Sequence, residues 1–426
     1  MKKLYKILLT VVFTLSFSES NANTLLNSLN SAYLNNSKLN AERANMRATK
    51  EEKREAVSEF LPSVTISGYI SEQENTNPGT DTNFEPSEQS ITVEQKIFQG
   101  FGGVANLQKK RKGQRIGVFK LKKVEQEILL EATKAHTNLL LNRKKVNINL
   151  INVELLERQV ETDQNRLEKG EINLTDLAQS ESSFSGAQAK LISAQNDLLN
   201  SNANFEKIIG KKPQSNIEDV KEINLKLPTS LATAQKISII ENPDLQIALF
   251  EFEQSKLDVV IASSELSPSA TLSYKKARQD DFSTAIKNRT QQTVTAKATW
   301  PLFAGGGNAF NLRKFQELRK QKQLLYEDNK KTIETNVINA WSTYQSSKGV
   351  LDSIRSQVRA AEIANEGITL EYESGNNRTT LEVIQSRTIL LNSRIDLATS
   401  QQSFLISQFN LLSSVGRLTA QHLNLK

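Results

Sequence analysis

The residue types that carry most enzyme chemistry are scarce in this sequence. The chain of 426 residues contains no cysteine and two histidines, and His136 and His422 lie far apart with no nucleophile or metal-ligand pattern beside them. Zinc sites built on cysteine and nucleophilic thiolates are therefore excluded. The sequence contains no phosphate-binding glycine loop, zinc motif or catalytic serine motif. We expect no catalytic residue, no metal and no cofactor, and a protein that is not an enzyme.

Two short turns are each followed by a carboxylate at the start of a predicted helix. Gly170-Glu171-Ile172-Asn173 precedes Asp176, and Gly375-Asn376-Asn377-Arg378 precedes Glu382. A glycine at the end of one helix permits the left-handed conformation that closes it. A carboxylate in the first turn of the next helix is stabilised by the helix dipole, which is an ordinary structural role. We therefore predict two hairpin tips, at Gly170 and at Gly375.

One basic run, Lys109-Lys110-Arg111-Lys112 with Arg115, resembles a nucleic-acid patch. A protein exported from the cytoplasm does not meet nucleic acid in its normal compartment, so we expect no nucleic-acid partner. We interpret the run as a solvated helix face near an anionic membrane leaflet.

The N-terminus predicts export. Three lysines precede an apolar run at residues 7–17, and Ser20-Asn21-Ala22 supplies the small residues of a cleavage site. This is the pattern of a secretory signal peptide over residues 1–22, and its removal takes the net charge from +7 to +5. No later stretch approaches the ~20 apolar residues of a membrane-spanning helix. The mature chain is either soluble in the periplasm or inserted through β-strands.

The sequence contains an internal duplication, in which matching motifs are separated by 205 or 206 residues. The markers shared by the two halves are short motifs rich in Pro, Gly and aromatic residues. They are Asn36-Ser37-Lys38-Leu39 with Asn242-Pro243-Asp244-Leu245, Phe60-Leu61-Pro62-Ser63 with Leu266-Ser267-Pro268-Ser269, Ile97-Phe98-Gln99-Gly100 with Leu302-Phe303-Ala304-Gly305, and Gly170 with Gly375. A repeat of this length is a whole structural unit rather than a solenoid module.

Each half is predicted to run helix, strand, polar loop, strand, long helix, turn, long helix. In the first half, residues 24–59 are expected to be one helix, and residues 72–89 a polar loop between two strands. A second polar loop is expected at residues 279–292. Each strand alternates apolar and polar residues over about ten positions, which fits a transmembrane strand. An amphipathic hairpin packed on the helices fits the pattern equally well.

If the strands face lipid, one chain cannot close a barrel, because a small closed barrel needs about eight strands. Two copies would give eight strands and a filled interior, whereas three would give twelve and begin to leave a lumen. Closing the sheet edges therefore requires oligomerisation.

The helices have the strongest periodicity. A seam with 3-4 spacing runs from Val337 to Tyr372, which is typical of a sustained coiled coil. The helix predicted at residues 104–168 would be ~100 Å long, too long for a compact domain. Thr175, and either Thr379 or Thr380, are expected to cap the helices that follow the tips.

With these features, the chain resembles the TolC family of outer-membrane efflux proteins. The resemblance covers essentially the whole mature chain, and each motif is weak alone but specific in this order. Besides the duplicated motifs, it rests on the strand exits Phe98-Gln99-Gly100-Phe101-Gly102-Gly103 and Trp300-Pro301-Leu302-Phe303-Ala304-Gly305-Gly306-Gly307, and on the tips Leu167-Glu168-Lys169-Gly170 and Tyr372-Glu373-Ser374-Gly375.

The resemblance implies an α+β, mostly α fold: a trimer with a twelve-stranded outer-membrane β-barrel continued by a long periplasmic α-helical barrel. It also implies docking on an inner-membrane transporter through a periplasmic adaptor protein. The implied organisation is a first structural repeat at 23–210, a linker or equatorial segment at 211–235, a second repeat at 236–416 and a C-terminal tail at 417–426.

The resemblance also implies a gate at the periplasmic tips. Asp176 matches an acidic position of the gate network, Tyr372 and Arg378 match its partners, and Glu382 matches an acidic ring at the constriction. Three copies of a carboxylate near one axis would favour cations and raise one another's pKa. Gln385 stands where a second acidic residue is expected, so this ring would carry less charge. Arg378 fits a solvated surface position equally well.

Four aromatic residues stand at the strand exits: Phe98, Phe101, Trp300 and Phe303. We interpret them as an interfacial aromatic belt, with core packing as the alternative. The function predicted is a passive outer-membrane conduit for an efflux or type I secretion system. The alternative is a non-conducting periplasmic coiled-coil scaffold or adhesin, which has no need of four amphipathic strands in two matched copies.

Overall fold

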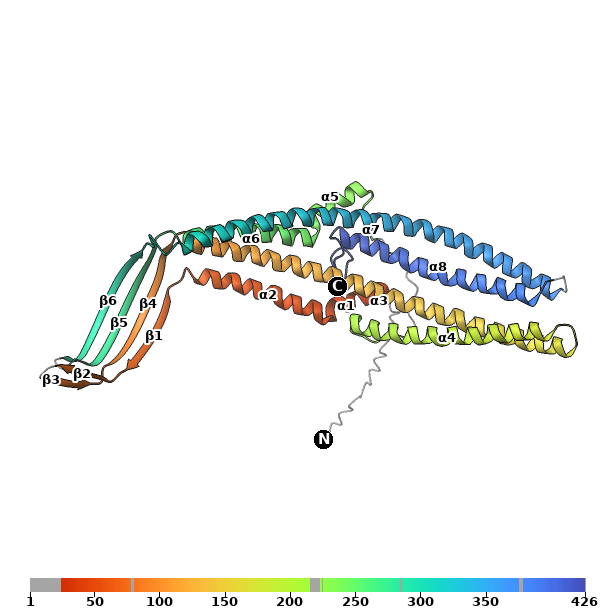
Figure 1. Cartoon of the computed structure of the whole chain (residues 1–426), viewed down its shortest axis with the longest axis horizontal. Helices are drawn as coiled ribbons and strands as arrows, with labels where there is room; N and C mark the ends of the chain where they lie inside the picture. The colour runs from red at the N-terminus through yellow and green to blue at the C-terminus, as the bar shows by residue number, and fades with distance from the viewer. Residues whose placement is uncertain are drawn as a thin grey trace, which may run out of the picture. The chain divides into compact units, whose positions relative to one another are not determined.

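The computed structural model describes residues 24–77, 80–214, 223, 225–283, 286–374 and 378–425 (Figure 1). The signal-peptide prediction and Gly375 lie outside these residues. The first half contains α1 (Leu25–Asn35), α2 (Ser37–Ser58), β1 (Ser63–Ile70), β2 (Gln73–Asn77), β3 (Thr80–Phe84), β4 (Ser87–Gln99), α3 (Gly102–Glu168) and α4 (Leu174–Ile209). The second half contains α5 (Leu231–Glu241), α6 (Pro243–Ser264), β5 (Ser269–Ser283), β6 (Ile286–Thr299), α7 (Gly307–Glu373) and α8 (Thr380–Ser414).

The single helix predicted at residues 24–59 is wrong, because the chain breaks at Asn36 into α1 and α2. Asn36 adopts an extended conformation (φ −65°, ψ 124°), and its side chain accepts hydrogen bonds from the backbone N–H groups of Lys38 and Leu39. Asn242 does the same between α5 and α6 (φ −66°, ψ 122°). Asparagine satisfies N–H groups left free at a helix start, so it stabilises a new helix rather than continuing the old one. Pro243 reinforces the second break from the first position of α6.

Four strands form one antiparallel sheet in the order β1-β4-β5-β6. The register places Val64, Val93, Tyr274 and Val294 in one row across the sheet. The adjacent row contains Thr65, Thr92, Lys275 and Thr293 on the opposite face. One face of the sheet is therefore apolar and the other polar. In the single chain every residue of β1 is exposed, so the helices do not cover the apolar side chains of this strand.

Both predicted polar loops contain strands. Residues 72–89 include the hairpin β2–β3, which forms its own two-stranded sheet, and the start of β4. Between β5 and β6 the pairing continues past Gln279 to Asp280, and after an irregularity reaches Ser283 opposite Ile286. Backbone pairing needs no apolar side chains, so alternation detected only the apolar part of each strand.

The long helices match the predicted coiled-coil character. Helices α3 and α7 have 67 residues each, which corresponds to about 100 Å at 1.5 Å per residue. Small buried residues recur every seven positions on both shorter partner helices. On α4 they are Ser180, Ala187, Ala194 and Ser201, and on α8 they are Ser386, Ser393, Ser400 and Ser407. Small side chains in a seam let neighbouring helices approach closely. None of the helices in the described ranges is both long and apolar enough to cross a membrane.

The chain divides into two compact units, and each takes segments from both halves of the sequence. Unit 1 contains Met1–Ala32, Ala132–Asn224 and Ala360–Ala398, so it holds both hairpin tips. Its core includes Leu156, Ala187 and Ile384. Unit 2 contains Tyr33–Glu131, Leu225–Arg359 and Thr399–Lys426, and so holds the sheet.

The core of unit 2 includes Val337, Leu411 and Val415. The C-terminal tail folds onto this unit. Arg417 forms an ion pair with Glu241 at 2.6 Å, and a ring nitrogen of His422 lies 3.0 Å from the carbonyl oxygen of Leu225.

Candidate functional site at the helical tips

The tip between α3 and α4 is closed by two linked caps. Gly170 has a left-handed φ of 72°, and the N–H groups of Gly170 and Glu171 donate to the carbonyls of Leu167 and Arg166, both at 2.9 Å. This pair of bonds is a Schellman motif. Helix α4 then begins with a capping box in which the Asn173 side chain accepts from the N–H of Asp176 at 3.0 Å and the Asp176 carboxylate accepts from the N–H of Asn173 at 3.4 Å.

The prediction that Thr175 caps α4 is therefore wrong, because Asn173 occupies the cap. Asp176 lies at the third position of α4, where a carboxylate reaches back to the cap residue. Among the described residues, Asp176 is hydrogen-bonded to Asn173 and not to Tyr372 or Arg378.

The tip between α7 and α8 has a cluster of charges at its surface. Thr379 forms the matching capping box: its hydroxyl accepts from the N–H of Glu382 at 3.3 Å, and the Glu382 carboxylate accepts from the N–H of Thr379 at 2.8 Å. Arg378 donates to Glu371 at 2.6 Å and to Glu382 at 2.9 Å. The structure thus joins Arg378 and Glu382, two residues that the sequence assigned to the gate.

The ionisation of this surface cluster follows from its contacts. The backbone N–H of Thr379, and then the guanidinium of Arg378, lower the pKa of Glu382. Hydrogen bonds to Glu371 and then Glu382 raise the pKa of Arg378. In the single chain, Glu382 is therefore held ionised by its neighbours.

A second group of polar residues is buried inside unit 1, centred on Asp163. This carboxylate has no exposed surface. It accepts hydrogen bonds from the Ser180 hydroxyl at 2.5 Å, the Gln159 side-chain amide at 3.1 Å and the Tyr372 hydroxyl at 3.4 Å. A buried carboxylate is tolerated only when such partners replace water, so these contacts stabilise the arrangement of the helices around it.

The network extends from Tyr372 to another residue of α3 and to helix α8. The Tyr372 hydroxyl accepts from the Arg166 guanidinium, which also lies over the tyrosine ring at 5.1 Å from its centroid. Thr380 Oγ1 lies 3.1 Å from the same hydroxyl. Arg387 donates to the Gln159 side chain at 3.3 Å, and burial lowers the pKa of its guanidinium. We call these residues the tip network: Gln159, Asp163, Arg166, Ser180, Tyr372, Thr380 and Arg387.

The tip network links all four helices of the two hairpins. Gln159, Asp163 and Arg166 come from α3, Ser180 from α4, Tyr372 from α7, and Thr380 and Arg387 from α8. Of the residues in the tip network, only Tyr372 was predicted from the sequence to belong to the gate. A signal for Asp163 was present, because this charged residue stands between Val160 and Leu167 in the apolar seam of α3.

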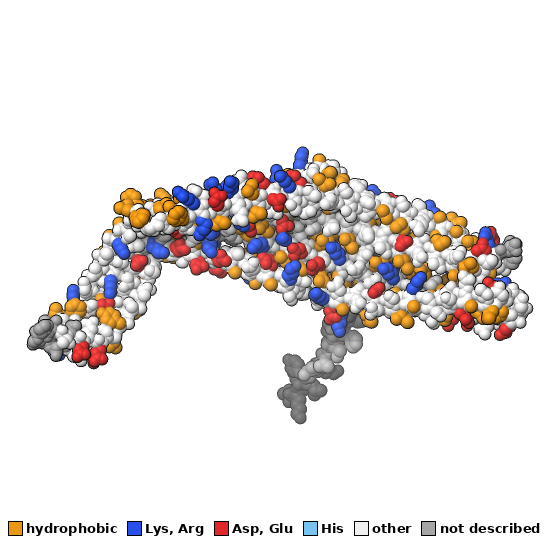
Figure 2. Space-filling view, in the orientation of Figure 1, with side chains coloured by type: hydrophobic (Ala, Val, Ile, Leu, Met, Phe, Trp, Pro, Cys, Tyr) orange, Lys and Arg blue, Asp and Glu red, His pale blue; other side chains and the backbone are white. Residues whose placement is uncertain are grey.

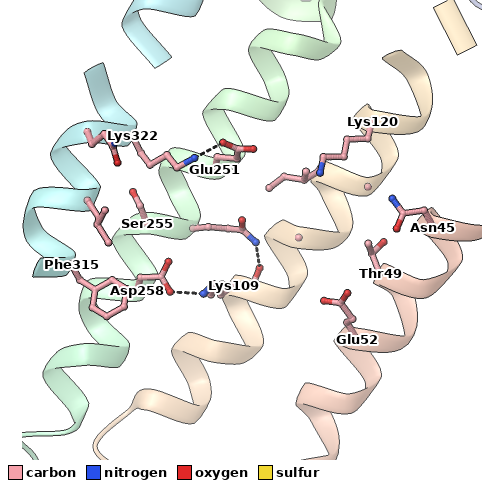
Figure 3. A pocket seen from close by; sticks show the side chains of 16 residues that line it. Asn45, Thr49, Glu52, Lys109, Lys120, Glu251, Ser255, Asp258, Phe315 and Lys322 are labelled. Carbon is pink, nitrogen blue, oxygen red and sulfur yellow. Dashed lines mark hydrogen bonds and ion pairs between the residues drawn. The ribbon is translucent and has the colours of Figure 1, made fainter. Parts of the chain in front are cut away.

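Unit 2 has a groove with a volume of about 550 Å³ between α2, α3, α6 and α7 (Figure 3). Lysines of the basic run lie beside it and form ion pairs: Lys109 with Asp258 at 2.5 Å, Lys110 with Glu52 at 2.9 Å and Lys112 with Glu253 at 2.5 Å. Our interpretation of the run as a solvated face needs correction, because carboxylates of α2 and α6 compensate three of its charges.

The four aromatic residues at the strand exits are at least partly exposed rather than packed in the core. Phe98 and Phe101 contact edge to face at 5.4 Å, and the Trp300 indole donates to the carbonyl of Leu266 at 3.1 Å. Phe101, Trp300 and Phe303 are 68%, 62% and 87% exposed. Figure 2 shows hydrophobic side chains gathered where the strands meet the helices.

In the part of the chain that the structure describes, no group of three His, Cys, Asp or Glu residues is placed to hold a metal ion. The polar groups of the tip contact one another and are positioned to hold helices together.

The comparisons with known proteins fit a channel fold. The crystal structure of the Campylobacter jejuni CmeC outer membrane channel superposes with a TM-score of 0.83 at 14% identity, over 93% of this chain and 86% of CmeC. The chain therefore has the fold of a solved outer membrane channel.

The sequence comparisons give the family. The outer membrane efflux protein profile matches residues 28–211 and 236–417, so the chain belongs to this family, the TolC family, and its location is the outer membrane. The outer membrane efflux protein BepC of Brucella suis biovar 1 (strain 1330) is 26% identical over 407 residues, which are 95% of this chain and 87% of BepC. The outer membrane protein TolC of Escherichia coli (strain K12) is 22% identical over 444 residues, covering 99% of this chain and 88% of TolC.

Proposed function

We propose that three copies of this chain form a passive channel through the outer membrane, closed at the periplasmic side by the helical tips. The observation that carries the proposal is the sheet β1-β4-β5-β6, which combines one apolar face with two open edges. Of the described strands, β1 pairs only with β4, and β6 only with β5. In lipid an open edge leaves backbone groups without partners, so the edges must be paired.

The number of strands supports a trimer. Pairing β6 of one protomer with β1 of the next joins the sheets of successive copies and removes the open edges. Three copies give twelve strands, which begin to leave a lumen, whereas two give eight and an interior filled by side chains. The apolar face would contact lipid, the polar face would line the water-filled pore, and the exposed aromatics Phe101 and Trp300 would lie at the membrane interface.

The tip network supports closure by the helices of unit 1. Tyr372 and Asp163 join the α7–α8 hairpin to the α3–α4 hairpin, and Arg387 joins α8 to α3 through Gln159. Opening an entrance at the tips requires the two hairpins to separate. Each hydrogen bond across the network opposes that separation by about 1 kcal/mol, or about twice that when one partner is charged.

The surface cluster supports a constriction that favours cations. Three copies of Glu382 near one axis would repel one another, and Arg378 offsets part of that charge in each copy. We include Asp176 in the proposed gate because it lies at the other hairpin tip, between α3 and α4. The capping box and a place in the gate are compatible roles for its carboxylate.

Energy for transport would come from partners. We propose a periplasmic adaptor and an inner-membrane transporter as those partners, in an efflux or type I secretion system, with drugs, metabolites and secreted polypeptides as the candidate cargo classes. We also propose a signal peptide at residues 1–22, structural repeats at 23–210 and 236–416, a connecting segment at 211–235 and a tail at 417–426.

The test is to isolate the protein from outer membranes and record single-channel currents in planar bilayers. We expect a trimer with small resting currents that increase in the variants Tyr372→Phe and Asp163→Asn. A monomer that dissolves without detergent and carries no current would instead support the alternative, a non-conducting scaffold.

A further inference from the structure

The apolar face of the sheet carries charge at one place. Side chains alternate between faces along β5, so Ala270, Leu272 and Tyr274 share a face with the three residues Lys276, Arg278 and Asp280. The register adds no other charged residue to this face from the described residues of β1, β4 and β6. The face therefore changes from apolar to charged within one strand.

The neighbouring strands show the same change of character. The Tyr274 row contains Val93 and Val294, the next row on this face places Lys276 between Ile91 and Gln292, and the row after it places Arg278 between Gln89 and Thr290. From Ala270 to Arg278 is eight residues, or about 27 Å along the strand. With the usual tilt of 35–45° this is ~20 Å of height, close to the ~25 Å apolar band of a membrane barrel.

The cations of this face differ from a cation on the polar face in their partners. On the polar face, Lys275 forms an ion pair at 2.6 Å with Glu88, which is 9% exposed in its side chain. On the apolar face, Lys276 has no ion pair among the described residues, and Arg278 meets Asp280 at 3.5 Å through one nitrogen. The Arg278 side chain is 69% exposed. Two cations and one carboxylate leave a net positive charge on this face.

A basic residue on a lipid-facing strand is costly at the membrane centre and nearly free at the interface. The phosphates of lipid headgroups lie at that interface, and a guanidinium binds phosphate with two parallel hydrogen bonds. Because β5 begins beside helix α6, the far end of the strand lies at the outer leaflet if the helices are periplasmic.

We propose that Lys276 and Arg278 form a binding site for the phosphate of an anionic lipid in the outer leaflet. This inference rests on the proposed function, because it places the sheet in the membrane. The lysine supplies a mobile point charge, and the arginine supplies a planar donor group. Asp280 positions the arginine and limits the site to headgroups whose phosphate can approach from the Lys276 side.

The experiment uses the full-length protein purified in neutral detergent. Mixed micelles with phosphatidylglycerol, lipid A or zwitterionic phosphatidylcholine are titrated in, and bound lipid is counted by native mass spectrometry. Inorganic phosphate alone is a further arm that separates a lipid site from a simple anion site. We expect retention of the two anionic lipids, little retention of phosphatidylcholine and no effect of inorganic phosphate.

The double variant Lys276→Gln with Arg278→Gln should bind anionic lipid at least about tenfold more weakly. The matched control, Lys96→Gln with Lys297→Gln, removes the same charge from the opposite face, where both lysines flank Thr271 in the register. This control should bind lipid like the unmodified protein.

Equal lipid binding by the Lys276/Arg278 variant and the unmodified protein would overturn the inference, as would equal loss in the Lys96/Lys297 control. The proposed function is tested separately. If the unmodified protein forms conducting trimers but its lipid binding ignores Lys276 and Arg278, only the lipid site fails. If no trimer or current is found, the channel proposal itself fails.

Discussion

Tyr372 donates a hydrogen bond to Asp163 although 209 residues separate them in the chain, with 3.4 Å between the two oxygens. The contact joins the C-terminal end of α7 to the last turns of α3. The same hydroxyl accepts a hydrogen bond from the Arg166 guanidinium. The Tyr372 side chain therefore bridges the Asp163 carboxylate and the Arg166 guanidinium.

Tyr372→Phe should increase the resting current of the channel. The substitution keeps the ring and its contact with Arg166 but removes the hydroxyl that contacts Asp163, Arg166 and Thr380. Loss of these bonds should weaken closure by about 1–3 kcal/mol, and planar-bilayer recordings measure the change. Tyr344→Phe is the control, because its ring lies in unit 2, stacked on Phe404. Equal currents in the two variants would remove Tyr372 from the gate.

Replacing Asp176 and Glu382 together by alanine should increase leak and reduce cation preference. Two carboxylates are lost per protomer, and Arg378 loses one of its two anionic partners. Reversal potentials in a KCl gradient measure the selectivity. Loss of the carboxylate half of each capping box should also destabilise the start of α4 and of α8. The variant Asp176→Asn with Glu382→Gln separates charge from capping, because both amides can still accept a hydrogen bond. Unchanged current and selectivity in both variants would reject the gate assignment.

His136 should make unit 1 sensitive to acid. The ring is fully buried, its Nδ1 lies 2.9 Å from the Ser28 hydroxyl, and burial, helped by the charge of Arg143, lowers its pKa to about 4. The unfolded chain therefore takes up a proton near pH 6.5, whereas the folded chain does so only near pH 4. Stability should be complete above pH 6.5 and should fall by about 3 kcal/mol as the pH drops from 6.5 to 4.

Thermal unfolding followed by circular dichroism at pH 7.5 and pH 4.5 measures this loss. His136→Gln should melt lower at pH 7.5 but with a smaller difference between the two pH values, because glutamine does not titrate. An equal pH dependence in the variant and the unmodified protein would assign the acid sensitivity to other groups.

Gly416→Ala should destabilise unit 2. Gly416 has a φ of 87°, and a Cβ there would lie 2.4 Å from the carbonyl oxygen of Glu241. Both the left-handed backbone and the contact oppose a side chain, so we expect a loss of more than about 1 kcal/mol. Gly367→Ala is the control: this glycine lies within α7, and apart from the adjacent helix backbone nothing lies within 4 Å of the added Cβ. That variant should gain about 0.5–1 kcal/mol, and denaturant titration compares the two.

The sequence predicted local structure well where hydrophobic periodicity is strong. The apolar parts of β1, β4, β5 and β6 and the two 67-residue helices follow from alternation and from the seam. The break at Asn36 was missed because neither Pro nor Gly marks it. An asparagine cap does not change the hydrophobic periodicity from which the helix was predicted. The last residues of β5 and the first residues of β6 were missed because most of their side chains are polar.

The candidate site was harder to predict, because its residues meet only after two hairpins pack together. Arg378 and Glu382 are four residues apart and could be found locally. Asp163 and Tyr372 are distant in the sequence. The only sequence signal for Asp163 was that a charged residue stands in the apolar seam of α3. The contact of Arg387 with Gln159 spans 228 residues of sequence, so local patterns did not indicate it.

The β2–β3 hairpin is present in the first half of the chain and has no counterpart among the described residues of the second half. Its end is tied to β5 by the N–H of Glu85, which donates to Asp281 at 3.0 Å. In a trimer, the two halves of each protomer would alternate around the mouth, so three such hairpins would stand between three bare strand turns. The extracellular rim would then have threefold symmetry, whereas the barrel wall below it would have pseudo-sixfold symmetry. A ligand that binds from outside the cell would therefore have three equivalent binding positions at the rim rather than six.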